Sequence, residues 1–468
     1  MQSILPEQSY LTGPISSKEW HRFEHYARFI HDLRCELEHQ ALDTSVFFYL
    51  SEHAQGRPLF PNLNKLTFDA RNAAYELLSI ITPSIRILQI SCACRCLEQH
   101  GYDTLRYRQQ CYAFKMLLPD VVRRLPVLCE LKLPELGHKA FWSALSPQPD
   151  GRFISQTVRR LDIQIECPFG ELLEAAISAI STISGLADLT LTSGVRKDVD
   201  EEMEMPDGWR ADAITAEFPC LRRLEIHGDM PAIVSLTSAV VAPMLEDVAL
   251  VRNVDDIVLA DSYLPVLALD VLCSRSATSL RDLYFELKVC ARFAAYWDYD
   301  SLSSSGVGLA KPLLRCRRLR KMDIFFQYSY ADLYEDGVVG VFDPVMLESW
   351  PELETAELVN VALPPALFCA IARGICPRLK CVTGYALSDE FLDLALDTLR
   401  TEEGNLGRKD PVSGAVRSYD LQTLGVTSPL GVHSAAAMEK IRRFMEELFP
   451  NIMANPRNSL SYFCELKQ

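Results

Sequence analysis

The sequence lacks the features that mark several large classes of protein. It contains no run of about 18 uncharged apolar residues, as a membrane-spanning helix requires, and its N-terminus lacks the basic start and apolar core of a secretory signal. Basic residues are the minority, with 47 Lys and Arg against 62 Asp and Glu, for a net charge of −15. A nucleic-acid-binding surface is basic. We therefore expect neither a nucleic-acid nor a membrane partner.

Catalytic and cofactor-binding motifs are also missing. There is no Gly-x-Ser-x-Gly elbow and no phosphate loop that ends in Gly-Lys-Ser/Thr. His21 and His25 have the spacing of a zinc protease, but the Glu that should follow the first His is absent. Cys92, Cys94 and Cys96 alternate like the apolar residues of a strand and do not form the paired knuckles of a structural zinc site. We predict a non-enzymatic protein without cofactor or metal.

The cysteine content bears on the cellular compartment. The chain has 15 cysteines among 468 residues and no secretory signal. Thiols in a reducing compartment behave as small apolar side chains and do not build a disulfide framework. We expect a cytoplasmic or nuclear protein whose cysteines are mostly buried.

The strongest signal in the chain is an internal repeat. A short phrase with the pattern Leu-x-x-Leu-x-Leu, introduced by a Pro or Cys, occurs twelve times, as in "FPNLNKLTF" and "WPELETAEL". The first apolar residues of these phrases, here called anchors, are separated by 22 to 43 residues. The anchors are Leu63, Ile85, Leu128, Val158, Leu186, Leu221, Leu245, Leu280, Leu319, Leu353, Leu379 and Leu421. Twelve such phrases indicate a repeat architecture.

Each phrase predicts a strand, because its last two apolar residues are two positions apart and share one face. Helical patterns lie between phrases, for example at residues 171–183 and 364–375. A strand and a helix cannot bury their apolar faces alone, whereas stacked repeats bury a continuous core. The predicted fold class is α/β, an irregular leucine-rich-repeat-like solenoid with a parallel concave sheet, outer helices and helical caps.

The predicted domain organisation follows from where the repeats begin and end. Residues 1–14 form an N-terminal stub, and residues 15–58 form a helical cap that starts with a capping box at Ser16 and Glu19. Residues 59–428 contain the solenoid of about 12 repeats, and residues 429–468 form a C-terminal helical cap and tail.

Strand alternation also predicts which side chains face solvent. Acidic side chains outnumber basic ones at these positions, where Tyr284 and Phe325 add aromatic groups. The candidate partner-binding residues are Asp162, Asp188, Glu225, Asp247, Asp282, Tyr284, Glu286, Asp323 and Phe325. Two interpretations remain open. The charges are a solvated face of an open sheet, or they form an acidic track that attracts a basic segment of a protein partner.

The stretch "PISSKEWHRFEHYARFIHDL" followed by "LFPNLNKLTF" resembles the region after the F-box in fungal F-box proteins with leucine-rich-repeat-like domains. "WPELETAEL", "CPRLKCV" and the terminal "FPNI" are similar to that family as well. The resemblance implies that the repeats hold a protein substrate and that an F-box binds the Skp adaptor of a cullin-based ubiquitin ligase. Only residues 4–11, "ILPEQSYL", resemble the start of an F-box, so we expect the F-box to be missing and the adaptor not to bind.

Two functions follow. The first is a non-enzymatic interaction scaffold that binds a protein partner, with a basic segment, on its concave face. The alternative is the substrate-recognition subunit of a cullin-based ubiquitin ligase whose F-box is truncated from this chain.

Overall fold

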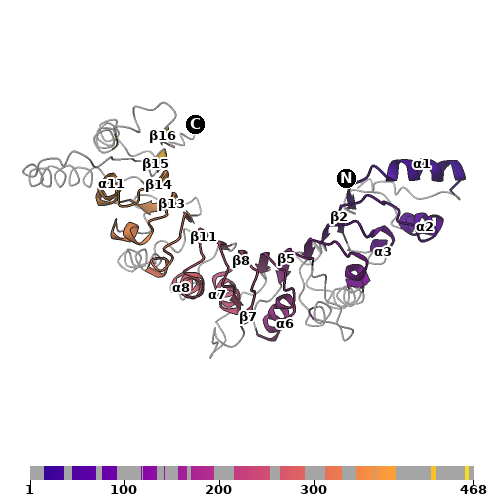
Figure 1. The fold of residues 1–468 in the computed structure, drawn as a ribbon, viewed down its shortest axis with the longest axis horizontal. Coiled ribbons are helices and arrows are strands. Elements are labelled where there is room, and N and C mark those ends of the chain that lie inside the picture. Colours follow the sequence, from indigo (N-terminus) through magenta and orange to yellow (C-terminus); the bar gives the residue numbers. More distant parts are fainter. Residues whose placement is uncertain are drawn as a thin grey trace, which may run out of the picture. The chain divides into compact units, whose positions relative to one another are not determined.

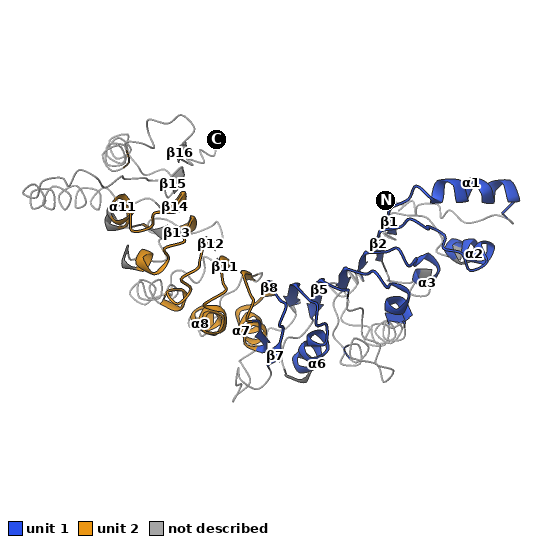
Figure 2. Cartoon of the chain, viewed as in Figure 1, with its two compact units in different colours: residues 1–226, 239–242 blue, residues 227–238, 243–468 orange. Residues whose placement is uncertain are grey.

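The computed structural model describes much of the chain, and its residues fall into two compact units. Unit 1 comprises Met1–Ile226 and Ala239–Ala242, and unit 2 comprises His227–Ser238 and Pro243–Gln468 (Figure 2). The described residues are 15–35, 45–69, 76–91, 117–118, 120–133, 142, 157–165, 170–193, 215–252, 264–289, 311–328, 344–363, 365–385, 423–427, 449 and 459–462.

Unit 1 is a row of parallel strands with helices along one side (Figures 1 and 2). The strands lie in the order β1-β2-β3-β4-β5-β6-β8, and pairing from β1 to β6 is parallel. Its helices are α1 (Ser17–Ala27), α2 (Ser45–Ala54), α3 (Glu76–Ile80) and α6 (Gly170–Ser181). Its strands are β1 (Asp32–Cys35), β2 (Lys65–Asp69), β3 (Ile87–Ser91), β4 (Glu130–Leu133), β5 (Arg160–Ile165), β6 (Asp188–Ser193) and β8 (Arg223–Gly228). A separate parallel pair joins β7 (Ala216–Glu217) to β9 (Val240–Val241).

Unit 2 repeats the same arrangement. Its strands lie in the order β10-β11-β12-β13-β14-β15-β16, and all of these pairs are parallel. They are β10 (Asp247–Arg252), β11 (Asp282–Val289), β12 (Lys321–Tyr328), β13 (Thr355–Ala362), β14 (Cys381–Tyr385), β15 (Thr423–Thr427) and β16 (Ser459–Tyr462). The helices are α7 (Met230–Ala239), α8 (Leu264–Ser276), the 3-10 helix η4 (Pro344–Ser349) and α11 (Pro365–Ala372).

Every one of the twelve repeat phrases contains a strand, which confirms the mixed α/β class and the parallel sheet. In many phrases a buried residue three positions before the anchor accepts a hydrogen bond from the anchor N–H and so closes a turn. Leu63 N–H donates to Phe60 O at 3.1 Å, and Leu353 N–H donates to Trp350 O at 3.1 Å. Proline often stands second in such turns because its fixed φ suits that position.

The start of most strands is fixed by a carbonyl that accepts from two N–H donors, an arrangement we call the shared-carbonyl ladder. Glu246 O accepts N–H groups from Arg281 at 2.8 Å and Asp282 at 2.9 Å. Arg281 O in turn accepts from Arg320 at 2.7 Å and Lys321 at 3.0 Å. The same pattern continues at Arg320 O and Glu354 O in unit 2, and occurs in unit 1 at His31 O, Asn64 O, Arg86 O, Cys129 O, Arg159 O and Ala187 O. Neighbouring repeats are therefore held in one register.

Side-chain burial alternates along the strands. In β5, Leu161, Ile163 and Ile165 are buried, while Asp162 and Gln164 between them are half-buried. Strands β6, β8 and β10 show the same alternation. The buried positions form the core against the helices, and we call the set of alternating, more exposed positions the open face of each unit.

One phrase ends in glycine where the others have an apolar side chain, and the structure explains the exception. Gly384 lies in β14, and a Cβ there would stand 2.5 Å from the side chain of Leu363. Leu363 follows β13, whose pairing with β14 is irregular between Glu357 and Ala362. The leucine side chain thus occupies the space that a larger residue at 384 would need.

The predicted caps differ from the structure at both ends. The capping box at Ser16 and Glu19 is confirmed, but α1 ends at Ala27 and is followed by β1, so the region 15–58 is not purely helical. Leu33 therefore lies in β1 and not on the helix. At the other end, β16 lies within the predicted cap and tail 429–468. The predicted stub 1–14 and most of the predicted cap and tail 429–468 lie outside the described residues.

Within the described ranges, no helix combines the length and apolar character needed to cross a lipid bilayer.

Candidate functional site

The open face of unit 2 is formed by side chains in rows across its strands. The first row places Asp247 of β10 beside Asp282 of β11, and Asp282 beside Lys321 of β12. The next row continues from Tyr284 to Asp323 and then to Glu357 of β13. In the third row Glu286 stands beside Phe325. Each of these three rows therefore contains at least one acidic side chain.

An aromatic pair lies in the middle of these rows. The rings of Tyr284 and Phe325 are 5.2 Å apart between centroids, with planes tilted by 34°. The Tyr284 hydroxyl donates to Glu286 Oε2 at 2.6 Å, which fixes both side chains. Glu286 is only 9% exposed, although its strand position belongs to the open face. The pair therefore makes a local apolar platform among carboxylates.

Asp323 is the most enclosed charged group of this face, at 4% exposure. The Lys321 ammonium lies 2.6 Å from Asp323 Oδ2, and the lysine side chain is half exposed. Asp323 Oδ1 is buried and has no hydrogen-bond partner among the described residues. A buried carboxylate normally has partners for both oxygens. Asp323 is thus only half satisfied.

The surroundings shift the protonation equilibria of these groups. Burial raises the pKa of the Asp282 carboxyl, against the opposing effect of Lys321, Arg320 and Arg281. The hydrogen bond to Asp323 raises the pKa of Lys321, which therefore stays charged. Burial and the bond to Glu286 raise the pKa of Tyr284, which stays a neutral donor. The face therefore presents the charged Lys321 ammonium and the neutral Tyr284 hydroxyl beside its acidic side chains.

The open face of unit 1 has a different charge balance. Lys132 of β4 lies 2.6 Å from Asp162 of β5, and Arg223 lies 3.6 Å from Glu225 on β8. Asp188 of β6 stands beside Arg160 in the register. Each of the three candidate acidic residues in unit 1 therefore has a basic neighbour.

The structure places all nine candidate residues on the open faces, but not all as predicted. Asp162, Asp188, Glu225, Asp247, Asp282, Tyr284 and Phe325 are half-buried. Glu286 and Asp323 are buried, so their prediction as solvent-facing was wrong. Both lie next to the aromatic pair, with Asp323 beside Tyr284 and Glu286 beside Phe325 in the β11–β12 register. The structure adds Lys321 and Glu357 to the group, both at positions that strand alternation also identifies.

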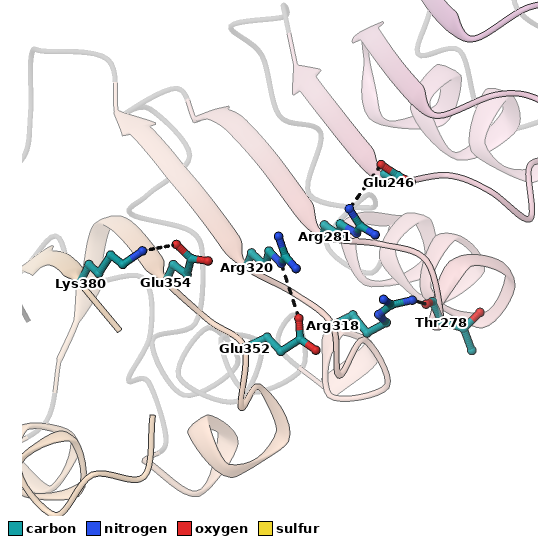
Figure 3. A network of polar contacts seen from close by, with 8 residues as sticks. All are labelled: Glu246, Thr278, Arg281, Arg318, Arg320, Glu352, Glu354 and Lys380. Carbon is teal, nitrogen blue, oxygen red and sulfur yellow. Dashed lines mark hydrogen bonds and ion pairs between the residues drawn. The ribbon is translucent and has the colours of Figure 1, made fainter. Parts of the chain in front are cut away.

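A border of ion pairs runs along the segments that lead into the strands of unit 2 (Figure 3). Arg281 lies 3.8 Å from Glu246, and Lys380 lies 2.6 Å from Glu354. Arg320 is 3.5 Å from Glu352, and Arg318 donates to Thr278 O at 3.4 Å. The same segments carry the shared-carbonyl ladder, so the border reinforces the stacking of repeats.

Several cysteines among the described residues are buried free thiols. Burial raises the pKa of Cys35 to about 11 and that of Cys376 to about 12, so both stay protonated at neutral pH. The free thiols of Cys273 and Cys316 share a hydrogen bond, which together with burial raises the pKa of Cys273 and which lowers the pKa of Cys316. The nucleophilic form of cysteine is the thiolate. Among the described residues, no group of three or more His, Cys, Asp or Glu side chains is placed to hold a metal ion. Cys92, Cys94 and Cys96 lie outside these ranges.

Comparison with protein-family models found no match, and comparison with curated proteins found none either.

Proposed function

We propose that this chain is a leucine-rich-repeat-like solenoid that acts as a non-enzymatic interaction scaffold. Three features support the architecture: twelve repeat phrases that each form a strand, parallel pairing within each unit, and one strand face that stays partly exposed. Parallel sheets usually have both faces covered. A parallel sheet with one open face is typical of stacked repeats that use that face for binding.

The observation that carries the binding role is the charge of the open face in unit 2. Asp247, Asp282, Glu286, Asp323 and Glu357 stand there with Lys321 as a basic neighbour. An acidic surface attracts a basic segment and accelerates its association, and the Tyr284–Phe325 pair supplies apolar contact area. The partner is therefore a protein with a basic segment.

The experiment is a titration of the purified chain with a basic peptide and with an acidic peptide of equal length, followed by fluorescence anisotropy. We expect the basic peptide to bind, and its affinity to fall as salt is raised, because salt screens exposed charges. Equal binding of the two peptides, or an affinity that does not change with salt, would contradict the proposal.

The second candidate is substrate recognition for a cullin-based ubiquitin ligase, which rests on the resemblance of residues 14–33 to the region after an F-box. The binding face would be the same and the partner would be the protein to be ubiquitinated. Co-purification of the Skp adaptor with the natural gene product, expressed in its own cell, tests this role. If the adaptor is absent from a preparation that still contains the protein partner, the ligase role is contradicted and the scaffold function remains.

A further inference from the structure

We propose that Asp323 receives the guanidinium group of a partner arginine, in the place that the Lys321 ammonium holds in the free chain. This inference rests on the proposed function and specifies its chemistry. The open face of unit 2 would then select arginine and not merely positive charge.

The first argument is the unequal state of the two Asp323 oxygens. Lys321 Nζ lies 2.6 Å from Oδ2, while Oδ1 is buried and has no hydrogen-bond partner among the described residues. An ammonium is a compact point charge, and here it serves one oxygen. A guanidinium is planar and donates two parallel hydrogen bonds to the two oxygens of one carboxylate. Arginine in place of Lys321 would satisfy both.

The second argument is the position of the aromatic pair. Tyr284 stands beside Asp323 in the β11–β12 register, and Phe325 is two residues further along the same face of β12. The two rings form one platform with 5.2 Å between centroids. A guanidinium can stack on an aromatic ring while its edge bonds a carboxylate, which an ammonium cannot do. The site therefore matches the planar shape of the arginine guanidinium as well as its positive charge.

The third argument is that the present occupant can leave. The Lys321 side chain is 50% exposed, so it has room to turn towards solvent, whereas Asp323 is fixed at 5% side-chain exposure. Asp282 of β11 stands beside Lys321 in the register and offers the displaced ammonium another carboxylate. Exchange therefore keeps every charge close to an opposite one.

The test uses two labelled peptides of the same length and charge, one of alternating arginine and glycine and one of alternating lysine and glycine. Their affinities for the purified full chain are measured by fluorescence anisotropy at fixed salt. We expect the arginine peptide to bind at least about tenfold more tightly, because bidentate bonds are the stronger kind.

Two substitutions at Lys321 separate this mechanism from simple charge attraction. In Lys321→Arg the chain supplies its own guanidinium to both oxygens, so the arginine peptide should bind about tenfold more weakly although the net charge is unchanged. In Lys321→Met the site is vacant, and the arginine peptide should bind more tightly than to the wild type. The matched control is Lys132→Arg, at the ion pair with Asp162 in unit 1. It should leave both affinities unchanged.

Asp323→Asn should remove the preference for the arginine peptide, and circular dichroism verifies that this variant folds. If Asp323→Asn misfolds, the two Lys321 variants still test the inference, because both retain the buried carboxylate. Equal affinity of the two peptides, or full affinity of Lys321→Arg for the arginine peptide, overturns the inference and leaves the scaffold function standing. Failure of both peptides to bind overturns the scaffold function as well.

Discussion

Units 1 and 2 each place a lysine–aspartate pair on their open face at the same distance but in different surroundings. Lys132 and Asp162 come from neighbouring strands, and Asp162 retains 24% side-chain exposure. Lys321 and Asp323 lie two residues apart on one strand, where Asp323 retains only 5% side-chain exposure and stands beside Tyr284 of the neighbouring strand. An ion pair at 2.6 Å is thus a solvated surface contact in unit 1 and a half-satisfied buried one in unit 2. Environment, not distance, makes the second pair a candidate site.

The largest expected effect is a loss of stability in unit 2 when a buried side chain of its core is removed. Trp350 is fully buried, and its Nε1–H donates to Leu313 O at 2.9 Å. Trp350→Ala should lower the free energy of unfolding by about 3–5 kcal/mol, because it leaves a large cavity. Denaturant titration measures this loss. Trp350→Phe keeps most of the volume and should cost less, and an equal loss for the two variants would contradict the cavity argument.

Charge reversal should affect binding in unit 2 more than in unit 1. Asp247→Lys together with Asp282→Lys should weaken binding of a basic peptide at least about tenfold, because it replaces attraction by repulsion. The matched variant in unit 1, Asp162→Lys with Asp188→Lys, changes the net charge equally. Peptide titration of both variants decides the outcome. Equal losses would mean that total charge, and not the open face of unit 2, attracts the peptide.

Replacing each lysine separately by methionine should show that the two ion pairs contribute differently to the free energy of unfolding. Lys132→Met should change the free energy of unfolding by about 0–1 kcal/mol, as for other exposed pairs. Lys321→Met leaves Asp323 buried without its partner and should cost about 1–3 kcal/mol. Thermal or denaturant unfolding of both variants gives the difference. A larger loss for Lys132→Met would show that Asp323 is not enclosed as described.

The smallest expected effect is a shift in pH dependence. Burial raises the pKa of Asp282, so this carboxylate takes up a proton at a higher pH than an ordinary aspartate. Protonation removes a negative charge, so binding of a basic peptide should weaken as pH falls from neutral. Asp282→Asn should bind more weakly at neutral pH and lose that part of the dependence. Affinity measured across the pH series would reveal it, and identical profiles would argue against a role for Asp282.

Sequence patterns predicted the strands well because each phrase contains its own strand and turn. The first strand, β1, escaped prediction because its phrase is degenerate: Ile30, Leu33 and Cys35 hold the apolar positions after the buried Ala27. The turn hydrogen bond from Ile30 to Ala27 shows that it follows the same rule as the others.

Burial at the candidate site could not be predicted in the same way. Alternation assigns Asp323 and Glu286 to the open face, which is correct for their strand positions. Asp323 and Glu286 come to stand beside Tyr284 and Phe325 only through the pairing of β11 with β12, whose anchors Leu280 and Leu319 are 39 residues apart. Such side-chain contacts depend on register between strands, which a single sequence does not encode locally.

The shared-carbonyl ladder determines where such a chain can accept insertions during evolution. It fixes only the residues from an anchor to the start of its strand, and the anchors are 22 to 43 residues apart. An insertion within that fixed stretch would shift the strand by a residue and turn its apolar side chains outward. An insertion elsewhere in a repeat leaves the register intact. Each repeat can therefore acquire or lose loops on its own, and the parallel frame of strands is kept unchanged.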